Sequence, residues 1–144
     1  MFKEHLLQKI NQTPTPFYYY DIELLKKTLQ QIKEISEKYN FVVHYALKAN
    51  FNTRILNTIK EYGLGADCVS GNEVKKAIEV GFSPDKVVFA GVGKSDKEII
   101  EALNNDIFCF NVESVQELGV INGLAAAAGK KANIASSFTL LTEN

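Results

Sequence analysis

Residues 41–52 read FVVHYALKANFN, and this stretch decides which kind of fold to expect. Its β-branched and aromatic residues are typical of a strand, which we expect to end at Lys48, just before Asn50. The alternation of side chains along a strand puts His44 and Lys48 on the same face. In α/β folds the carboxyl end of a strand is where chemistry is found, and a lysine that loses solvent becomes a nucleophilic amine suited to Schiff-base formation.

The remainder of the chain repeats one pattern, an apolar run followed by an amphipathic segment of helical length. The apolar runs recur about every 20 to 25 residues, which is typical of a strand and a helix in alternation, and they begin near Val42, Leu64, Val87, Ile107 and Ala132. Helices are expected between them, at 53–62, 72–80, 96–103 and 115–128. Strands joined in this way must be parallel. Such (β/α) repeats close into a barrel or open into a doubly wound sheet, and periodicity does not decide between the two.

The first 40 residues precede these repeats. Residues 1–10 predict a short amphipathic helix, which the TPTP sequence at 13–16 interrupts because proline cannot continue a helix. Residues 17–20 (FYYY) predict a short aromatic strand. Asp21 then offers a side-chain cap for a helix that runs to Tyr39.

Composition excludes several classes of function. The chain has 144 residues, 46% of them hydrophobic and 23% charged, which is the balance of a soluble globular domain. A net charge of −1 gives no drive toward nucleic acid or an anionic membrane, so we expect neither as a partner. Cys68 and Cys109 are expected to be buried free thiols, and the absence of a long apolar run favours the cytoplasm. His5 and His44 lack partners at metal-ligand spacing, so no metal is expected. His44 is expected to be a core histidine whose polar atoms are hydrogen-bonded.

Four motifs along the chain resemble a known family, the fold-type III PLP-dependent decarboxylases. They occur in that family's order and spacing, and they read YALKAN at 45–50, GADCVSGNE at 65–73, VVFAGVGKSD at 87–96 and FNVESVQEL at 110–118. Within the family the sequence is most similar to the diaminopimelate decarboxylases. The resemblance extends over nearly the whole chain, from Thr15 to Ile134.

The resemblance implies an α/β fold, in which the parallel (β/α) repeats form about half of a TIM-type (β/α)8 barrel of the alanine racemase-like kind. It assigns residues 1–21 to an N-terminal helix and strand that pair with a second, β-rich domain, which is missing from this sequence. It assigns residues 22–144 to the first half of the PLP-binding barrel. The implied activity is PLP-dependent decarboxylation of meso-2,6-diaminopimelate to L-lysine, carried out by a homodimer on a small amino-acid substrate.

The resemblance also implies which residues form the site. Lys48 corresponds to the lysine that binds PLP as a Schiff base, and Asp67, Ser70 and Asn50 are the expected cofactor-binding residues. Asn72 stands where the family usually has a second glycine. From the residues alone, Asp67 could instead be a turn aspartate that bonds its own backbone, and Ser70 could simply cap a helix.

Serine and glutamate recur at the starts of three expected helices, as Ser70 and Glu73, Ser95 and Glu98, and Ser114 and Glu117. The spacing S-x-x-E is that of a capping box. If the strands are parallel, their carboxyl ends gather Lys48 and Asp67 with Gly91, Gly93, Asn111 and Glu113 on one rim.

Other interpretations stay open at this point. The chain could belong to another basic-amino-acid decarboxylase of the ornithine or arginine type, to a cofactor-free Schiff-base aldolase on a similar barrel, or to a non-catalytic βα fragment. Its last residues, SSFTLLTEN, depart from the family pattern. We therefore expect an incomplete N-terminal portion that is inactive on its own.

Overall fold

The structure, a computed structural model that describes residues 4–136, contains one parallel five-stranded sheet. The strands pair in the order in which they occur along the chain, β1-β2-β3-β4-β5, and every pair is parallel. Their bounds are β1 His44–Ala46, β2 Gly65–Cys68, β3 Val87–Phe89, β4 Cys109–Val112 and β5 Ile134–Ser136. The parallel repeats expected from the sequence are thereby confirmed.

A helix connects each strand to the next, with bounds within two residues of those expected. The helices are α1 Glu4–Gln12, α2 Ile22–Tyr39, α3 Thr53–Glu61, α4 Gly71–Val80, α5 Asp96–Asn104 and α6 Val115–Ala127. The Asp21 side chain accepts a hydrogen bond from the Leu24 N–H at 2.9 Å, as expected of the cap of α2. Single 3₁₀ turns lie at Leu47–Ala49 and Pro84–Lys86.

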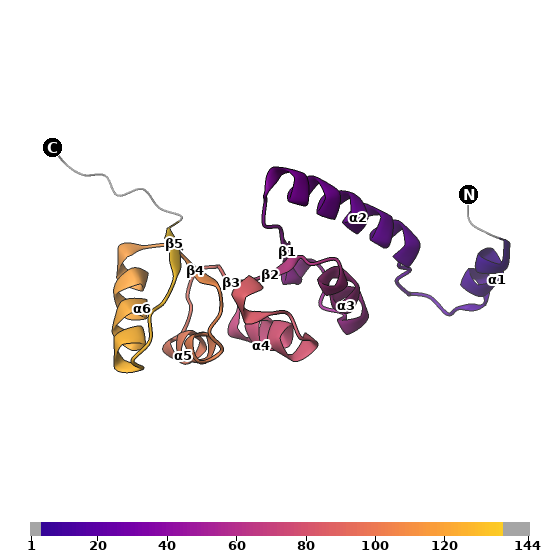
Figure 1. The fold of residues 1–144 in the computed structure, drawn as a ribbon. Coiled ribbons are helices and arrows are strands. Elements are labelled where there is room, and N and C mark those ends of the chain that lie inside the picture. Colours follow the sequence, from indigo (N-terminus) through magenta and orange to yellow (C-terminus); the bar gives the residue numbers. More distant parts are fainter. Residues whose placement is uncertain (1–3, 137–144) are drawn as a thin grey trace.

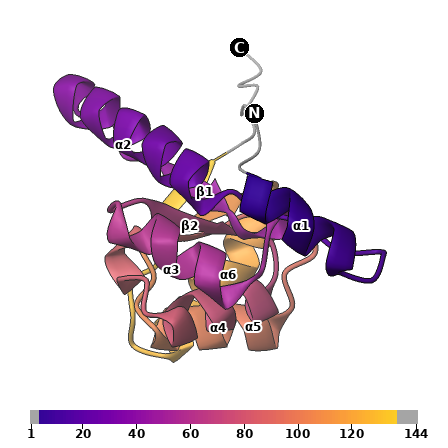
Figure 2. The same ribbon diagram turned by 90° about the vertical axis from the view of Figure 1, so that its right-hand side faces the viewer.

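The arrangement of the layers answers the question that periodicity left open. The strands follow an arc, and helices α3 to α6 lie together along its convex side (Figures 1 and 2). A doubly wound sheet would carry helices on both faces, whereas a barrel carries them only outside. The fold is therefore α/β, with parallel (β/α) repeats arranged as part of a barrel.

The two faces of the sheet differ in chemistry. On β2, β3 and β4 the face toward the helices is apolar and buried, with Ala66, Cys68, Val87, Phe89 and Phe110 all within 2% of complete burial. The strand register places the alternate residues on the opposite side, which we call the concave face. Its members are His44, Ala46, Gly65, Asp67, Val88, Cys109, Asn111 and Ala135.

Two expectations about strands are wrong. The structure forms no strand over Phe17–Tyr20, whose aromatic side chains are exposed. A strand needs hydrogen bonds to the backbone of a neighbouring strand, and the strands of the described residues pair only with one another. The first strand also stops at Ala46, so Lys48 lies in the following 3₁₀ turn rather than on the strand. Residues 137–144, expected to continue the barrel, lie outside the described residues.

On the concave face, His44 packs directly over Gly65. A Cβ atom at Gly65 would come within 2.4 Å of His44 Cδ2 and 2.5 Å of the Lys86 carbonyl oxygen. The imidazole also stacks on the Phe108 ring, with 6.3 Å between the centroids. Because Phe108 immediately precedes β4, this contact spans the arc from β1 to β4 and helps to set its curvature.

His44 was expected to be a core histidine with its polar atoms satisfied, and this expectation is wrong. Its Nε2 is buried and has no hydrogen-bond partner among the described residues. Burial lowers the pKa of His44 below its usual value of 6.5, the Asp67 carboxylate opposes that shift and Lys86 adds to it. The neutral imidazole is therefore the form that the folded chain favours.

We predict that Gly65→Ala destabilises the fold by about 1 to 3 kcal/mol, since the added methyl group meets a ring and a backbone oxygen that cannot both retreat. Gly119→Ala, inside α6 with no atom within 4 Å of its added Cβ, is the matched control. It should stabilise by about 0.5 to 1 kcal/mol. Urea denaturation measures both. Equal midpoints for the Gly65→Ala variant and the parent chain would contradict the close packing of His44.

We also predict that His44 makes stability depend on pH. Its folded pKa lies below its unfolded value, so the unfolded chain takes up the proton first as pH falls. The stability contributed by neutral His44 is complete above about pH 6.5 and is lost as pH falls through the folded pKa. The urea midpoint should therefore drop between pH 7 and pH 5, and His44→Phe should remove most of this drop. His5→Asn, at the other histidine, should leave it in place, and an unchanged drop in His44→Phe would refute the assignment.

Candidate active site at the carboxyl ends of the strands

Lys48 lies at the rim of the sheet, one residue inside the 3₁₀ turn that follows β1. The turn is anchored by the fully buried Leu47, while the Lys48 side chain is exposed. The Asn50 N–H closes the turn by donating to the Leu47 carbonyl at 3.1 Å. The sequence therefore located the lysine at the correct edge, although a turn and not the strand presents its amine.

Asn50 shapes the connection from this turn to α3. Its Oδ1 accepts a hydrogen bond from the Asn52 N–H at 2.9 Å. Asn52 in turn caps α3 by accepting from the Arg54 N–H at 2.9 Å. These contacts of Asn50 are structural, and its expected contact with a cofactor stays a prediction.

Asp67 lies within β2, one residue before the strand ends, in register with Ala46 on one side and Val88 on the other. It is not a turn residue, so the alternative interpretation of Asp67 is excluded. Its Oδ1 is buried and has no hydrogen-bond partner among the described residues. Buried acceptors without partners are rare in folded proteins, so this oxygen is suited to a donor or a cation on the concave face.

Ser70 caps α4, as the structural interpretation of this serine predicted. Its hydroxyl accepts from the Glu73 N–H at 3.3 Å, while the Glu73 carboxylate reaches back to the Val69 N–H at 2.7 Å. The Gly71 N–H donates to Glu98 Oε1 at 2.8 Å. The Gly71 and Glu73 amides at the start of α4 are therefore already bound, by the Glu98 carboxylate and by the Ser70 hydroxyl, and a cofactor contact for that hydroxyl stays a prediction.

The other two S-x-x-E segments also cap their helices. Ser95 and Glu98 form a complete capping box at the start of α5, and these hydrogen bonds lower the pKa of Glu98. At α6, Ser114 caps the Glu117 N–H at 3.1 Å, but the Glu117 carboxylate accepts from the Glu113 N–H instead of from Ser114. A capping box is thus confirmed in full for one of the three segments.

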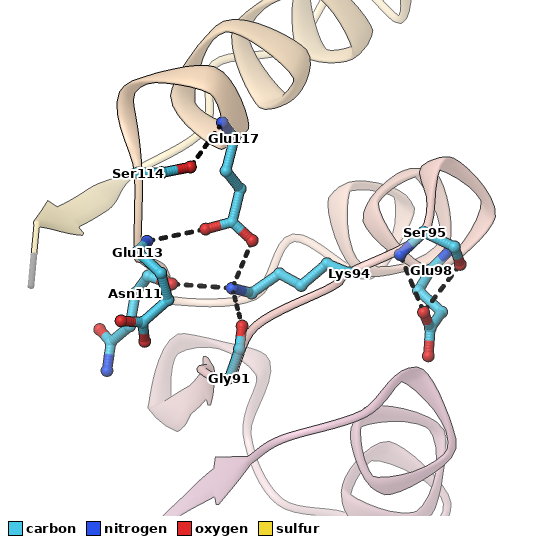
Figure 3. A network of polar contacts seen from close by, with 8 residues as sticks. All are labelled: Gly91, Lys94, Ser95, Glu98, Asn111, Glu113, Ser114 and Glu117. Carbon is cyan, nitrogen blue, oxygen red and sulfur yellow. Dashed lines mark hydrogen bonds and ion pairs between the residues drawn. The ribbon is translucent and has the colours of Figure 1, made fainter.

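Lys94 is the rim residue that sequence analysis missed. Its Nζ lies 2.9 Å from Glu117 Oε1, and it donates to the carbonyl oxygens of Gly91 at 2.6 Å and Asn111 at 2.8 Å (Figure 3). The ammonium group also lies 5.5 Å from the centroid of the Phe89 ring. The available signal was a single lysine between a strand end and a capping serine, which is more typical of a solvated loop.

Both cysteines are buried free thiols, as expected. Burial raises the pKa of the Cys68 thiol to about 12, and the charges of Glu73 and Asp67 add to the shift. Burial also raises the pKa of Cys109. Neither thiol is a nucleophile at neutral pH.

Within residues 4–136, no group of three His, Cys, Asp or Glu side chains is placed to hold a metal ion. The helices in that range are also too short or too polar to cross a membrane.

Residues 23–138 match the family model described as pyridoxal-dependent decarboxylase, pyridoxal binding domain. The chain is 54% identical over 130 residues to the diaminopimelate decarboxylase of Bacteroides thetaiotaomicron, covering 90% of this chain and 34% of that protein. The crystal structure of diaminopimelate decarboxylase from Helicobacter pylori, complexed with L-lysine, superimposes with a TM-score of 0.77 at 38% identity. That superposition covers 91% of this chain and 33% of the other.

A more distant relative shares the fold. Ornithine decarboxylase from Entamoeba histolytica superimposes with a TM-score of 0.73 at 26% identity, over 91% of this chain and 38% of that protein. The chain thus spans about a third of the length of the relatives that it matches. With a family model that matches most of its residues, this chain belongs to the pyridoxal-dependent decarboxylases and corresponds to their pyridoxal binding domain.

Proposed function

We propose that this chain forms the cofactor-attaching part of a diaminopimelate decarboxylase, with Lys48 as the residue to which PLP is bound. The observation that carries the proposal is the exposed Lys48 amine at the rim of a concave face on which the buried Asp67 Oδ1 lacks a partner. An aldehyde cofactor requires a primary amine, and a cationic or N–H group on that cofactor would satisfy the carboxylate.

The groups present fit PLP in part. When bound, PLP supplies an electron sink for the bond that is broken. Lys48 would hold it covalently, and Asp67 would orient the lysine nitrogen or a protonated group of the ligand, with Asn50 and Ser70 close by at the same rim. The negative charge on Asp67 would also stabilise a proton held at that nitrogen.

The structure further suggests where the phosphate group would not bind. Helix N-termini usually attract phosphate, but the carboxylates of Glu73, Glu98 and Glu117 lie at the starts of α4, α5 and α6. A phosphate placed there would meet like charges. By resemblance, the glycine-rich phosphate loop belongs to segments that these 144 residues do not contain.

Diaminopimelate is the substrate that the relatives favour. Identity is 54% and 38% to the two diaminopimelate decarboxylases and falls to 26% for the ornithine decarboxylase. A basic-amino-acid decarboxylase of the ornithine or arginine type is the second candidate, supported by the shared fold. The homodimer and the cytoplasmic location implied by the resemblance remain predictions.

We predict that reduction with borohydride in the presence of PLP labels Lys48 in preference to the other lysines. The amine and the aldehyde condense with loss of water, and hydride then converts the product into a stable secondary amine. Peptide mapping by mass spectrometry locates the label. Lys48→Arg should abolish this selective label. Lys76→Arg is the matched control, because Lys76 lies over the Phe51 ring near the same rim. Label spread evenly over the exposed lysines would refute the role of Lys48.

We predict that the 144-residue chain alone does not release labelled CO2 from carboxyl-labelled diaminopimelate at a measurable rate. By resemblance, it lacks the groups that hold the phosphate and the substrate's charged ends. Losses of positioning and electrostatic stabilisation of this kind cost several kcal/mol each, or about two to three orders of magnitude in rate apiece. The Bacteroides thetaiotaomicron enzyme, assayed alongside, is the positive control. Comparable rates from both proteins would show that this chain is catalytically complete.

A further inference from the structure

Lys94 joins three separate segments of the rim through one buried charge. Its side chain is 1% exposed and that of its partner Glu117 is 13% exposed. The three segments are the loop after β3, which contributes the Gly91 carbonyl, strand β4, which contributes the Asn111 carbonyl, and the first turn of α6, which contributes Glu117 (Figure 3). All three donor positions of the ammonium are therefore used.

Glu117 extends the network by one step. While Oε1 faces Lys94, Oε2 accepts a hydrogen bond from the Glu113 N–H at 2.7 Å. The backbone at the end of β4 is thus held at two points. The Lys94 ammonium binds the Asn111 carbonyl, and the Glu117 carboxylate binds the Glu113 N–H. The neighbouring capping box of Ser95 and Glu98 shares none of these groups.

A buried ion pair is poor evidence for stability, because the cost of removing two charges from water often exceeds their attraction. Such a pair is better understood as fixing one geometry among several. Here the geometry that it fixes is the backbone at the ends of β3 and β4, which is the rim where Lys48 and Asp67 also lie.

Because Lys94 binds the backbone of Asn111, it also affects how the Asn111 side chain is oriented. Its carbonyl oxygen faces Lys94, while its carboxamide points away from that group (Figure 3). The carboxamide lies on the concave face, where its Oδ1 is 3.7 Å from Cys109 Sγ. The stacking of His44 on Phe108 shows that side chains of β1 and the start of β4 meet across this face. Lys48, in the turn after β1, and Asn111, near the end of β4, lie further along the same parallel strands and therefore at the same edge of the sheet.

We propose that Lys94 is a positioning residue that sets the Asn111 carboxamide as a polar contact for the ligand bound at Lys48. The inference rests on the proposed function for the identity of that ligand, which is PLP. It adds a contact from β4 and a residue that acts only through the backbone of Asn111 and Gly91.

The test compares Lys94→Met, the double variant Lys94→Met with Glu117→Gln, and the control Lys97→Met. Lys97 lies close to Lys94 in the sequence, at the start of α5, but its side chain is 84% exposed. Lys94→Met alone leaves a buried carboxylate without its cation and should lower stability strongly. The double variant removes both charges, and glutamine still offers an oxygen to the Glu113 N–H, so stability should largely return.

Two measurements separate positioning from stability. The first is the PLP concentration that half-saturates borohydride labelling at Lys48, and it should rise about tenfold in the double variant while the maximal label stays the same. The second needs no PLP. A nuclear Overhauser contact between the Asn111 side-chain amide and the Cys109 β-protons should be present in the parent chain and in Lys97→Met, and lost in the double variant.

The inference is overturned if the double variant regains both stability and the parent's half-saturating PLP concentration, because Lys94 would then be only a structural residue. Retention of the Overhauser contact in the double variant overturns it equally. If the parent chain is not labelled at Lys48 at all, the proposed function fails instead. The Overhauser comparison then still decides whether Lys94 positions Asn111.

Discussion

Parallel pairing of consecutive strands is the constraint on which the rest of this structure depends. Because each connection must cross back over the sheet, all five strands end at one edge and the helices between them begin there. That edge therefore collects the groups that close each strand, among them Lys48, Asp67 and Asn111. It also collects helix N-termini, whose unpaired amides must find acceptors. The chemistry of the rim follows from the topology of the sheet.

Side chains of the protein supply several of these acceptors, because the hydroxyls of Ser70, Ser95 and Ser114 each accept from an amide in the first turn of the helix that they cap. Glu73, Glu98 and Glu117 each accept from backbone amides, and Glu98 serves two helices because it also binds the Gly71 N–H. Lys94 is the cation that balances this arrangement from within the protein. The result is a rim with its backbone already ordered, on which the exposed Lys48 and the unpartnered Asp67 Oδ1 are the groups suited to a ligand.

Most of the fold could be predicted from the sequence, because the spacing of apolar runs and the S-x-x-E segments are local signals that agree with the packing. The errors arose where tertiary contacts decide. The alternation around Lys48 looks like a strand throughout, but burial of Leu47 turns the backbone after Ala46. Lys94 contacts segments that are distant in the sequence, so no periodic pattern of residues predicts its position. The lack of a partner for His44 Nε2 likewise depends on the packing of the ring over Gly65.

The central claim is that the concave rim holds PLP on Lys48 with Asp67 as its polar partner. A crystal structure of the chain after reduction with borohydride in the presence of PLP tests it most directly. The account predicts a covalent bond between Lys48 Nζ and the former aldehyde carbon, with Asp67 Oδ1 hydrogen-bonded to the ligand and the phosphate away from the N-termini of α4, α5 and α6. A ligand attached to a different lysine, or a phosphate seated on one of those helix N-termini, would contradict it.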